Sequence, residues 1–578
     1  MKKARKLMAF LLAAVMVMGM TMSVSAANTT PHTIEIANAT DGYTYNAYQV
    51  FAGDYSEETG KLTNIDWGAG VDGDALLKAL SQETLDGGGD NPEYIAAFAG
   101  CGSAEAVAEV LANESDNSEL AKSFAEVVGN YITTPAGTTS TCQDGVYTIS
   151  VTGDGYYFVK NADVPTDGTH TRYLLEVVDN VEITHKGDVP EVTKEIDGGV
   201  TPSKDDAAIG DTVNYIITGT VTDEIANYNE YYYVFTDTLS KGLTYTPDSV
   251  VVTIGEVPVT EYFYVNATTD GEGVTTLKVG IQDLLALKNV ADPQVTINAG
   301  TEIKITYSAV INENAVVNGD GNSNTVSLEY SNDPNNSGEG TDQPPSDDPN
   351  KPEPNPDPNE PTGETPEQKV TTYVTELTIK KIIGGVTPET ALAGAAFRLE
   401  GKAGTTTNIV KATGEIFKES QTGTYYKLND GSYTTTAPTA ETESSYVGTN
   451  PYTMYEMVTE TSFKTQATPA ETVEAFVNED GLLTFTGLSA GTYTITEIVT
   501  PSGYNSIDPF DVEITFADGT FTITGLQDGV IKVENNSGST LPSTGGMGTT
   551  IFYIVGGVLV LVAVVLLVTR KRMKKEEV

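Results

Sequence analysis

The chain has 578 residues, with 32 basic and 80 acidic side chains and a formal net charge of −48. A surface this acidic repels phosphate groups, which excludes nucleic-acid binding. The length suggests three or four domains. We expect no cofactor and no metal, because the three histidines, His32, His170 and His185, show neither metal-ligand spacing nor the context of a catalytic nucleophile.

The N-terminal residues 1–26 have the pattern of a secretory signal peptide. Basic residues precede the apolar run Leu7–Met22, and Val24-Ser25-Ala26 fits a small-residue cleavage site. The sequence therefore predicts export.

Residues 27–188 predict an α+β domain. Strand-like segments flank a predicted helix over residues 119–131, where Phe124 and Val128 share one apolar face. The chain's two cysteines, Cys101 and Cys142, lie in this domain. Export permits a disulfide between them, with two unpaired thiols as the alternative.

Residues 189–335 carry only strand signals, and alternation places three polar residues on apolar strand faces. Lys194 lies between Val192 and Ile196, Asp237 shares a face with Phe235 and Leu239, and Asn324 alternates with the residues of its strand. Asn322 is the rival to Asn324. A lysine, an acid and an amide are thus all expected to point inward.

Residues 336–368 predict an extended linker, since nine prolines fall between Pro344 and Pro366. A third domain, residues 369–538, repeats the polar pattern with Lys381, Glu497 and Asn535 on apolar faces. Lys380 competes with Lys381, but alternation places it on the other face.

Two explanations fit such a buried set. One is a salt bridge with an asparagine hydrogen bond, because buried charges need partners. The other is an autocatalytic Lys-Asn isopeptide bond, in which burial yields a neutral amine and a protonated acid, the amine attacks the amide, and ammonia leaves. Each bond would join the first and last strands of its domain.

The C-terminal residues 541–578 contain Leu541-Pro542-Ser543-Thr544-Gly545, an apolar stretch at 551–568 and a basic tail. The stretch predicts a transmembrane helix, with the tail in the cytoplasm. An ordinary single-pass anchor is the alternative. The order of the three elements resembles the sorting signal of Gram-positive surface proteins, which implies that a sortase cuts after Thr544.

The third domain closely resembles Cna-B-type domains of Gram-positive pilins, in the segments 392–397 (LAGAAF), 481–488 (GLLTFTGL), 491–497 (GTYTITE) and 501–504 (PSGY). The resemblance implies that Glu497 is the acid that links Lys381 to Asn535. The second domain, through 235–243 (FTDTLSKGL) and 321–326 (GNSNTV), resembles a Cna-A-like fimbrial domain. There the same roles fall on Asp237, Lys194 and Asn324.

The resemblance implies a mainly β fold, with tandem Ig-like sandwiches after the α+β domain, and a major pilin rather than an enzyme. Lys186, read in Thr184-His185-Lys186 in place of the usual Tyr-Pro-Lys, is the expected acceptor for Thr544 of the next subunit. Expected partners are a sortase, identical subunits, ancillary pilins, peptidoglycan and host surface ligands. The alternative is a monomeric wall-anchored adhesin that binds a host ligand through its first domain.

Overall fold

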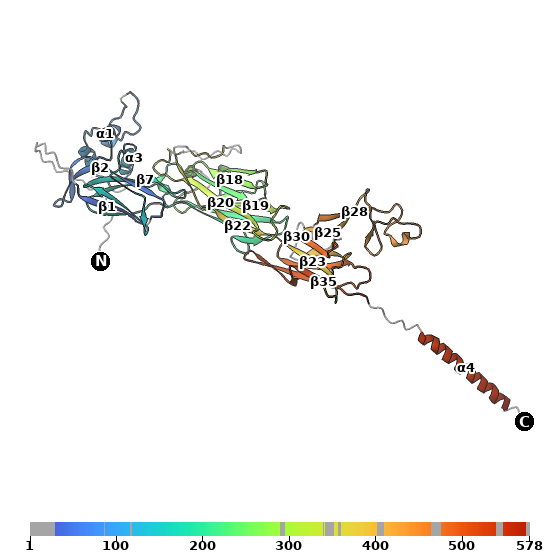
Figure 1. Ribbon diagram of the computed structural model, residues 1–578. Helices are drawn as coiled ribbons and strands as arrows, with labels where there is room; N and C mark the ends of the chain where they lie inside the picture. Colours follow the sequence, from blue (N-terminus) through green and yellow to red (C-terminus); the bar gives the residue numbers. More distant parts are fainter. Residues whose placement is uncertain are drawn as a thin grey trace, which may run out of the picture. The chain divides into compact units, whose positions relative to one another are not determined.

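The computed structural model describes residues 29–37, 39–85, 87–115, 118–289, 295–338, 340, 352–356, 360–401, 410–463, 475–538 and 547–573. The predicted signal peptide and the Leu541–Gly545 motif lie outside these residues. The chain divides into two compact units (Figure 1). The first runs to Thr375 and includes 487–490 and 515–522, and the second holds the rest from Glu376.

The first domain combines two sheets with three α-helices. Its elements are β1 (Pro31–Ala37), β2 (Thr44–Ser56), β3 (Lys61–Trp67), α1 (Gly73–Ser81), η1 (Ala96–Phe98), α2 (Ala104–Leu111), α3 (Glu119–Asn130), β4 (Gly137–Thr139), β5 (Cys142–Gln143), β6 (Val146–Thr152), β7 (Gly155–Asp163), β8 (Arg172–Val177) and β9 (Val181–Thr184). One sheet has the order β5-β6-β1-β9, and the other has the order β3-β2-β7-β8 with β4 on β2.

The predicted helix is confirmed as α3, and it begins where the Ser118 hydroxyl accepts from the Ala121 N–H. Its buried residues Phe124 and Val128 pack on Phe51 and Phe158 of the second sheet. The opposite face of that sheet packs against the first sheet in a separate core. The first domain is therefore layered, with helices on one sheet only.

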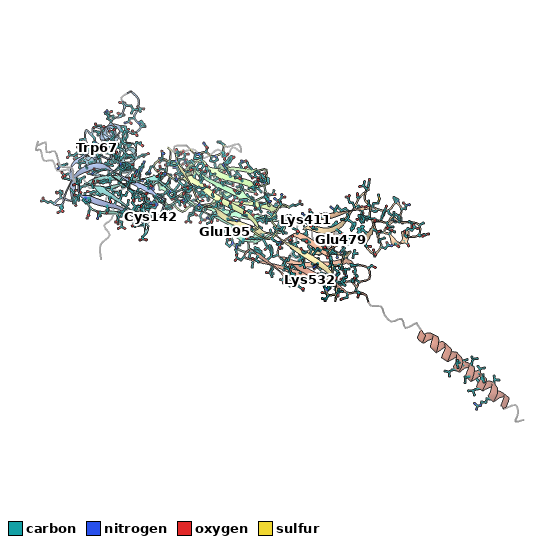
Figure 2. All side chains as sticks on the ribbon, in the orientation of Figure 1. Trp67, Cys142, Glu195, Lys411, Glu479 and Lys532 are labelled. Atoms are coloured by element: carbon teal, nitrogen blue, oxygen red, sulfur yellow. The ribbon has the colours of Figure 1, made fainter. Side chains whose placement is uncertain are left out.

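Both cysteines are free, as in the second of the two alternatives left open by the sequence. Cys101 packs against the core under the helices. Cys142, labelled in Figure 2, packs against the core between the two sheets. The two thiols therefore belong to different layers of the domain, which is why they do not meet.

The second domain is an all-β sandwich. Its elements are β10 (Glu191–Ile196), β11 (Lys204–Asp206), β12 (Thr212–Thr220), η2 (Ile225–Asn227), β13 (Tyr233–Leu239), β14 (Leu243–Tyr245), β15 (Val251–Ile254), β16 (Val257–Pro258), η3 (Thr260–Tyr262), β17 (Tyr264–Thr269), β18 (Thr275–Ile281), η4 (Leu284–Asn289), β19 (Glu302–Ile311), β20 (Asn322–Ser331), β21 (Thr362–Glu364) and β22 (Gln368–Tyr373). One sheet has the order β10-β12-β19-β15-β16 with β14 on β19, and the other has the order β11-β22-β20-β13-β18-β17 with β21 on β20.

Strands β21 and β22 come after the proline-rich segment, yet they complete the second sandwich. Strand β22 pairs antiparallel with β20, with Asn324 opposite Val370, and parallel with β11. Val370 is 1% exposed, so the strand contributes to the core. The described sandwich thus extends to residue 373, beyond the predicted boundary at 335.

Part of the proline-rich segment also contacts the second domain. Glu353 Oε1 lies 2.5 Å from Lys278 Nζ of β18, and the Asn355 N–H donates to Gln282 Oε1 at 3.0 Å. Residues 352–356 therefore run along the sandwich instead of standing apart as a spacer.

The third domain is built on one long sheet. Its elements are β23 (Thr375–Ile383), β24 (Ala396–Gly401), β25 (Val410–Glu419), β26 (Tyr426–Lys427), β27 (Tyr433–Thr434), η5 (Glu443–Ser445), β28 (Tyr455–Phe463), β29 (Ala475–Phe476), β30 (Leu482–Leu488), β31 (Gly491–Val499), β32 (Phe510–Ala517), β33 (Thr520–Ile523), β34 (Leu526–Gln527) and β35 (Val530–Asn535). The order is β33-β32-β31-β24-β29-β25-β30-β23-β35-β34, with β28 on β25, and β26 and β27 form a separate hairpin.

The first and last long strands of this domain are neighbours. Strands β23 and β35 pair in parallel, with Lys381 opposite Val533 and Ile383 opposite Asn535. Gly481 lies against β23, where its φ is +74° and an added Cβ would stand 2.4 Å from the Lys381 carbonyl oxygen. Only glycine fits this position without a shift of β23.

The C-terminal segment forms helix α4 (Met547–Met573). Among the residues described, no helix is both long enough and apolar enough to cross a membrane. The predicted membrane span at 551–568 is therefore not supported.

Candidate cross-linking sites

The second domain buries a lysine and an aspartate that face each other from its two sheets. Strand β10 alternates exposed and buried residues, which turns Lys194 inward and its neighbour Glu195, labelled in Figure 2, outward. Strand β13 of the opposite sheet supplies Asp237. Lys194 Nζ donates to Asp237 Oδ2, and the two side chains are 0% and 1% exposed. The pair is completely enclosed.

The hydroxyl of Tyr307, on β19, joins the whole set. It accepts from Lys194 Nζ at 3.0 Å and from Asn324 Nδ2 at 2.6 Å, and it donates to Asp237 Oδ1 at 2.8 Å. Tyr307 is 2% exposed and Asn324 0% exposed. The predicted lysine, acid and amide therefore meet around one buried hydroxyl. The sequence analysis missed Tyr307, because its inward register on β19 is one that any core tyrosine shares.

Burial sets the protonation of this site. Desolvation lowers the pKa of Lys194, although the nearby Asp237 carboxylate opposes the shift. Desolvation likewise raises the pKa of Asp237, against the attraction of Lys194. Both directions favour a proton on the carboxyl group and a neutral amine, which is the nucleophilic form of lysine.

Asn322 and Asn324 have different surroundings. Asn322 Oδ1 accepts from the Val316 N–H at 2.7 Å, and its Nδ2 donates to the Val316 and Thr372 carbonyl oxygens at 3.2 Å each. These bonds hold the turn before β20 and join it to β22. Asn324 Oδ1, in contrast, is buried and accepts no hydrogen bond from the residues described. The geometry favours Asn324 as the reacting amide.

If the second domain forms its Lys-Asn bond, the wild-type chain loses one ammonia there, and we expect Asn324→Ala to retain that mass. Asn322→Ala should still lose that ammonia, because the bonds of Asn322 go to Val316 and Thr372 and not to the cross-linking residues. Tryptic peptide mapping of the two variants by mass spectrometry checks this. The reverse result would assign the reacting amide to Asn322.

The third domain repeats the constellation with a glutamate. Lys381 on β23 donates through Nζ to Asn535 Oδ1 on β35, and the Lys381 and Glu497 side chains are both 0% exposed. Glu497 Oε1 lies 3.3 Å from Lys381 Nζ and accepts from Asn535 Nδ2 at 2.8 Å. Burial lowers the pKa of Lys381, against the attraction of Glu497. The amine is thus held against the side-chain carbonyl of Asn535.

Further contacts fix the acid and separate the two neighbouring lysines. Glu497 Oε2 accepts from the Thr500 hydroxyl and the Ile507 N–H, each at 3.2 Å. Lys380 lies on the other face of β23, where its Nζ stands 2.6 Å from Glu389 Oε1. The alternation of β23 therefore places the two lysines as predicted.

The predicted acceptor, Lys186, is exposed just after β9. Its backbone N–H donates to the Tyr173 hydroxyl at 2.9 Å. The preceding residue, His185, lies 2.7 Å through Nδ1 from the Tyr45 hydroxyl, and burial lowers the pKa of its imidazole. A backbone anchored in this way presents the exposed amine from a fixed position.

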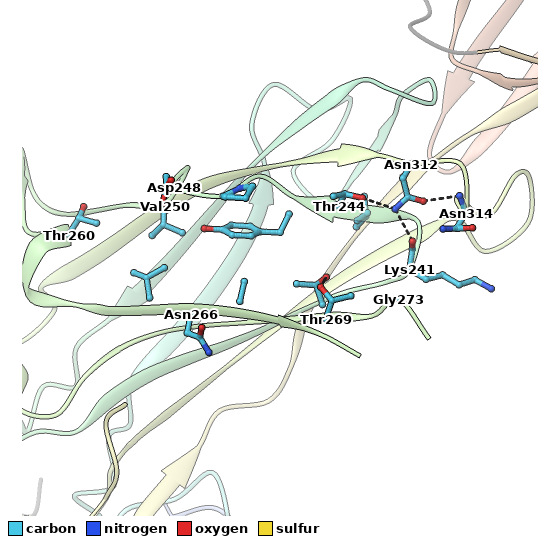
Figure 3. A pocket seen from close by; sticks show the side chains of 16 residues that line it. Lys241, Thr244, Asp248, Val250, Thr260, Asn266, Thr269, Gly273, Asn312 and Asn314 are labelled. Carbon is cyan, nitrogen blue, oxygen red and sulfur yellow. Dashed lines mark hydrogen bonds between the residues drawn. The ribbon is translucent and has the colours of Figure 1, made fainter. Parts of the chain in front are cut away.

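A separate cleft of about 780 Å³ opens in the second domain (Figure 3). On one side Asn312 Nδ2 donates to the Lys241 carbonyl oxygen and to the Thr244 hydroxyl, each at 2.9 Å. Thr269, labelled on the opposite side, bonds to Thr275 at 2.9 Å. The cross-linking residues do not line this cleft, so it forms no part of the site.

Three family models match the chain. Residues 209–334 match the Gram-positive pilin backbone subunit 2, Cna-B-like domain, residues 452–529 match the SpaA prealbumin-like fold domain, and residues 533–577 match the LPXTG cell wall anchor motif. The chain carries the domains of a Gram-positive backbone pilin. It is a structural subunit of a pilus shaft anchored to the cell wall. The pilin prediction is confirmed, although the model that matches the second domain is described as Cna-B-like, not Cna-A-like.

Two solved pilins align with most of the chain at low identity. The T6 backbone pilin of Streptococcus pyogenes is 16% identical, with 85% of this chain and 81% of that chain covered and a TM-score of 0.45. The major pilin SpaD of Corynebacterium diphtheriae is 14% identical, with 90% and 99% covered and a TM-score of 0.41. No match to a curated protein was found. The assignment rests on the family models, because identities and TM-scores this low carry no weight.

Proposed function

We propose that this pilin cross-links itself at two sites, Lys194–Asn324 and Lys381–Asn535, with Asp237 and Glu497 as the respective acids. The third-domain geometry carries the proposal. An enclosed lysine amine touches the carbonyl oxygen of the asparagine side chain, and one carboxylate oxygen touches the nitrogens of both. A plain ion pair would not need the amide between its members.

The reaction needs only groups that these sites hold. The neutral amine attacks the asparagine Cγ, a bond forms between Nζ and Cγ, and the bond between Cγ and Nδ2 breaks. The amine gives up one proton and the leaving nitrogen gains one, so ammonia departs and the carboxyl group ends as it began. Burial lowers the pKa of both lysines, which favours their neutral, nucleophilic form.

The bonds also suit a shaft that bears load. Lys381 and Asn535 lie on the parallel neighbours β23 and β35 and stand 154 positions apart in sequence. Tension applied to the ends of the domain would pass through the new amide before it could separate the strands.

For assembly, we propose that the exposed amine of Lys186 accepts the acyl group of Thr544 from the next subunit. Support comes from the match to the LPXTG anchor and from the exposure of Lys186 on an anchored backbone. A sortase would perform the transfer.

Intact-mass measurement of the exported chain tests the internal bonds. We expect a mass lower than that of the processed sequence by two molecules of ammonia. A chain with the full calculated mass would refute both cross-links and would leave only the buried ion pairs.

A further inference from the structure

Each cross-linking site needs a polar group that contacts both the lysine nitrogen and the asparagine nitrogen, and the two sites supply it differently. In the third domain, Glu497 Oε1 alone reaches both nitrogens, at 3.3 Å from Lys381 Nζ and 2.8 Å from Asn535 Nδ2. In the second domain the acid is an aspartate, which is shorter by one methylene group. Its described hydrogen bonds reach Lys194 and Tyr307 but not Asn324.

The Tyr307 hydroxyl makes the contact with Asn324 that Asp237 does not make. Its oxygen lies 3.0 Å from Lys194 Nζ, the entering nitrogen, and 2.6 Å from Asn324 Nδ2, the leaving nitrogen. Bond exchange requires one proton to move from the first nitrogen to the second. We propose that Tyr307 is a catalytic residue of the Lys194–Asn324 cross-link, whose hydroxyl carries this proton.

The proton transfer balances within the site. As the bond between Nζ and Cγ forms, the hydroxyl oxygen accepts a proton from Nζ and passes its own hydrogen to Nδ2, so that ammonia leaves and a neutral phenol remains. In the resting structure that hydrogen points to Asp237 Oδ1 at 2.8 Å. Once the Asp237 carboxylate has taken the first proton from Lys194, it no longer needs the hydrogen bond from Tyr307. The Tyr307 hydroxyl hydrogen can then turn toward Asn324.

The surroundings keep the hydroxyl neutral and in place. Tyr307 is 2% exposed, and burial raises the pKa of its phenol well above the ordinary value. Its ring stacks on Tyr215, with centroids 5.3 Å apart and planes at 28°. In the third domain, the ring described as facing Lys381 Nζ, at 5.7 Å, is that of Phe397, which carries no hydroxyl.

This inference rests on the proposed cross-linking, and Tyr307→Phe tests it because the substitution removes one oxygen and keeps the ring. The full chain would be sampled at intervals after synthesis, with each bond followed by peptide mapping. We expect the Lys194–Asn324 bond to form at least about 100-fold more slowly, as for loss of a general acid-base group. The Lys381–Asn535 bond in the same molecules should form at its normal rate.

Tyr233→Phe is the matched control, since it removes another buried tyrosine hydroxyl, on the strand that carries Asp237. It should leave both rates unchanged. A normal Lys194–Asn324 rate in Tyr307→Phe would overturn the role of Tyr307 and leave the cross-links standing. Loss of hydrogen-exchange protection in β12 and β19 of that variant would overturn it in favour of a structural role. Absence of both bonds from the wild-type chain would refute the proposed function itself.

Discussion

Replacing Lys381 with alanine is expected to lower the free energy of unfolding of the third domain by about 5 kcal/mol. The missing bond would close a loop of 154 positions, and the loop-entropy model for disulfides gives a stabilisation of that order for such a span. The variant also leaves Glu497 and Asn535 enclosed without their amine, which adds to the loss. Denaturant unfolding of the intact chain, together with its mass, measures both effects.

Lys380→Ala provides the matched control on the same strand. Lys380 is a third exposed and pairs with Glu389 at the surface, where solvent screening leaves such a pair little effect on stability. The control should lose ammonia normally and unfold almost as the wild type does. If Lys381→Ala also lost ammonia from the third domain, another lysine would have to be the nucleophile.

Replacing Lys186 with alanine is expected to abolish the covalent polymer. Denaturing gels of cell-wall extracts should change from a high-mass ladder to a single band, because Thr544 of each subunit would have no acceptor on the next. The internal cross-links should remain, since no described hydrogen bond or ion pair joins Lys186 to a cross-linking residue. A single band whose mass is lower by two molecules of ammonia indicates a folded subunit that failed to assemble. A single band with the full calculated mass indicates a subunit that failed to fold.

Lys122→Ala is the control for assembly. Lys122 is also an exposed lysine of the first domain, with 48% of its side chain accessible and a loose pairing to Glu119 at 3.7 Å. Its ladder should match that of the wild type. A ladder that persists in Lys186→Ala would assign the acceptor to a different amine and would refute the proposed linkage.

Strand alternation explains why six buried polar residues could be found from the sequence. A residue between two inward aliphatic residues must itself point inward, since the period of a strand is two. That rule placed Lys194 and Lys381 and separated Lys381 from Lys380. It could not select Tyr307, because a tyrosine on a core face is ordinary packing and only the fold shows what its hydroxyl touches.

Long-range pairing explains what could not be predicted. The prolines before residue 366 indicate an extended chain, but no local signal shows that β22 returns to pair with β20 in the second sandwich. The same limit applies to Cys101 and Cys142, since their spacing does not reveal that they lie in different layers. The choice between Asn322 and Asn324 likewise depended on backbone partners that only the turn geometry supplies.

The parallel pairing of β23 with β35 has a consequence for how this pilin could vary. With Lys381 bonded to Asn535, force that enters through one of these strands would leave through its immediate neighbour. The polypeptide between residues 384 and 529, although it supplies Glu497 for bond formation, would then carry little of the load. The hairpin of β26 and β27 and the turns around it belong to that stretch. Foreign peptides grafted there would decorate the fibre without weakening it.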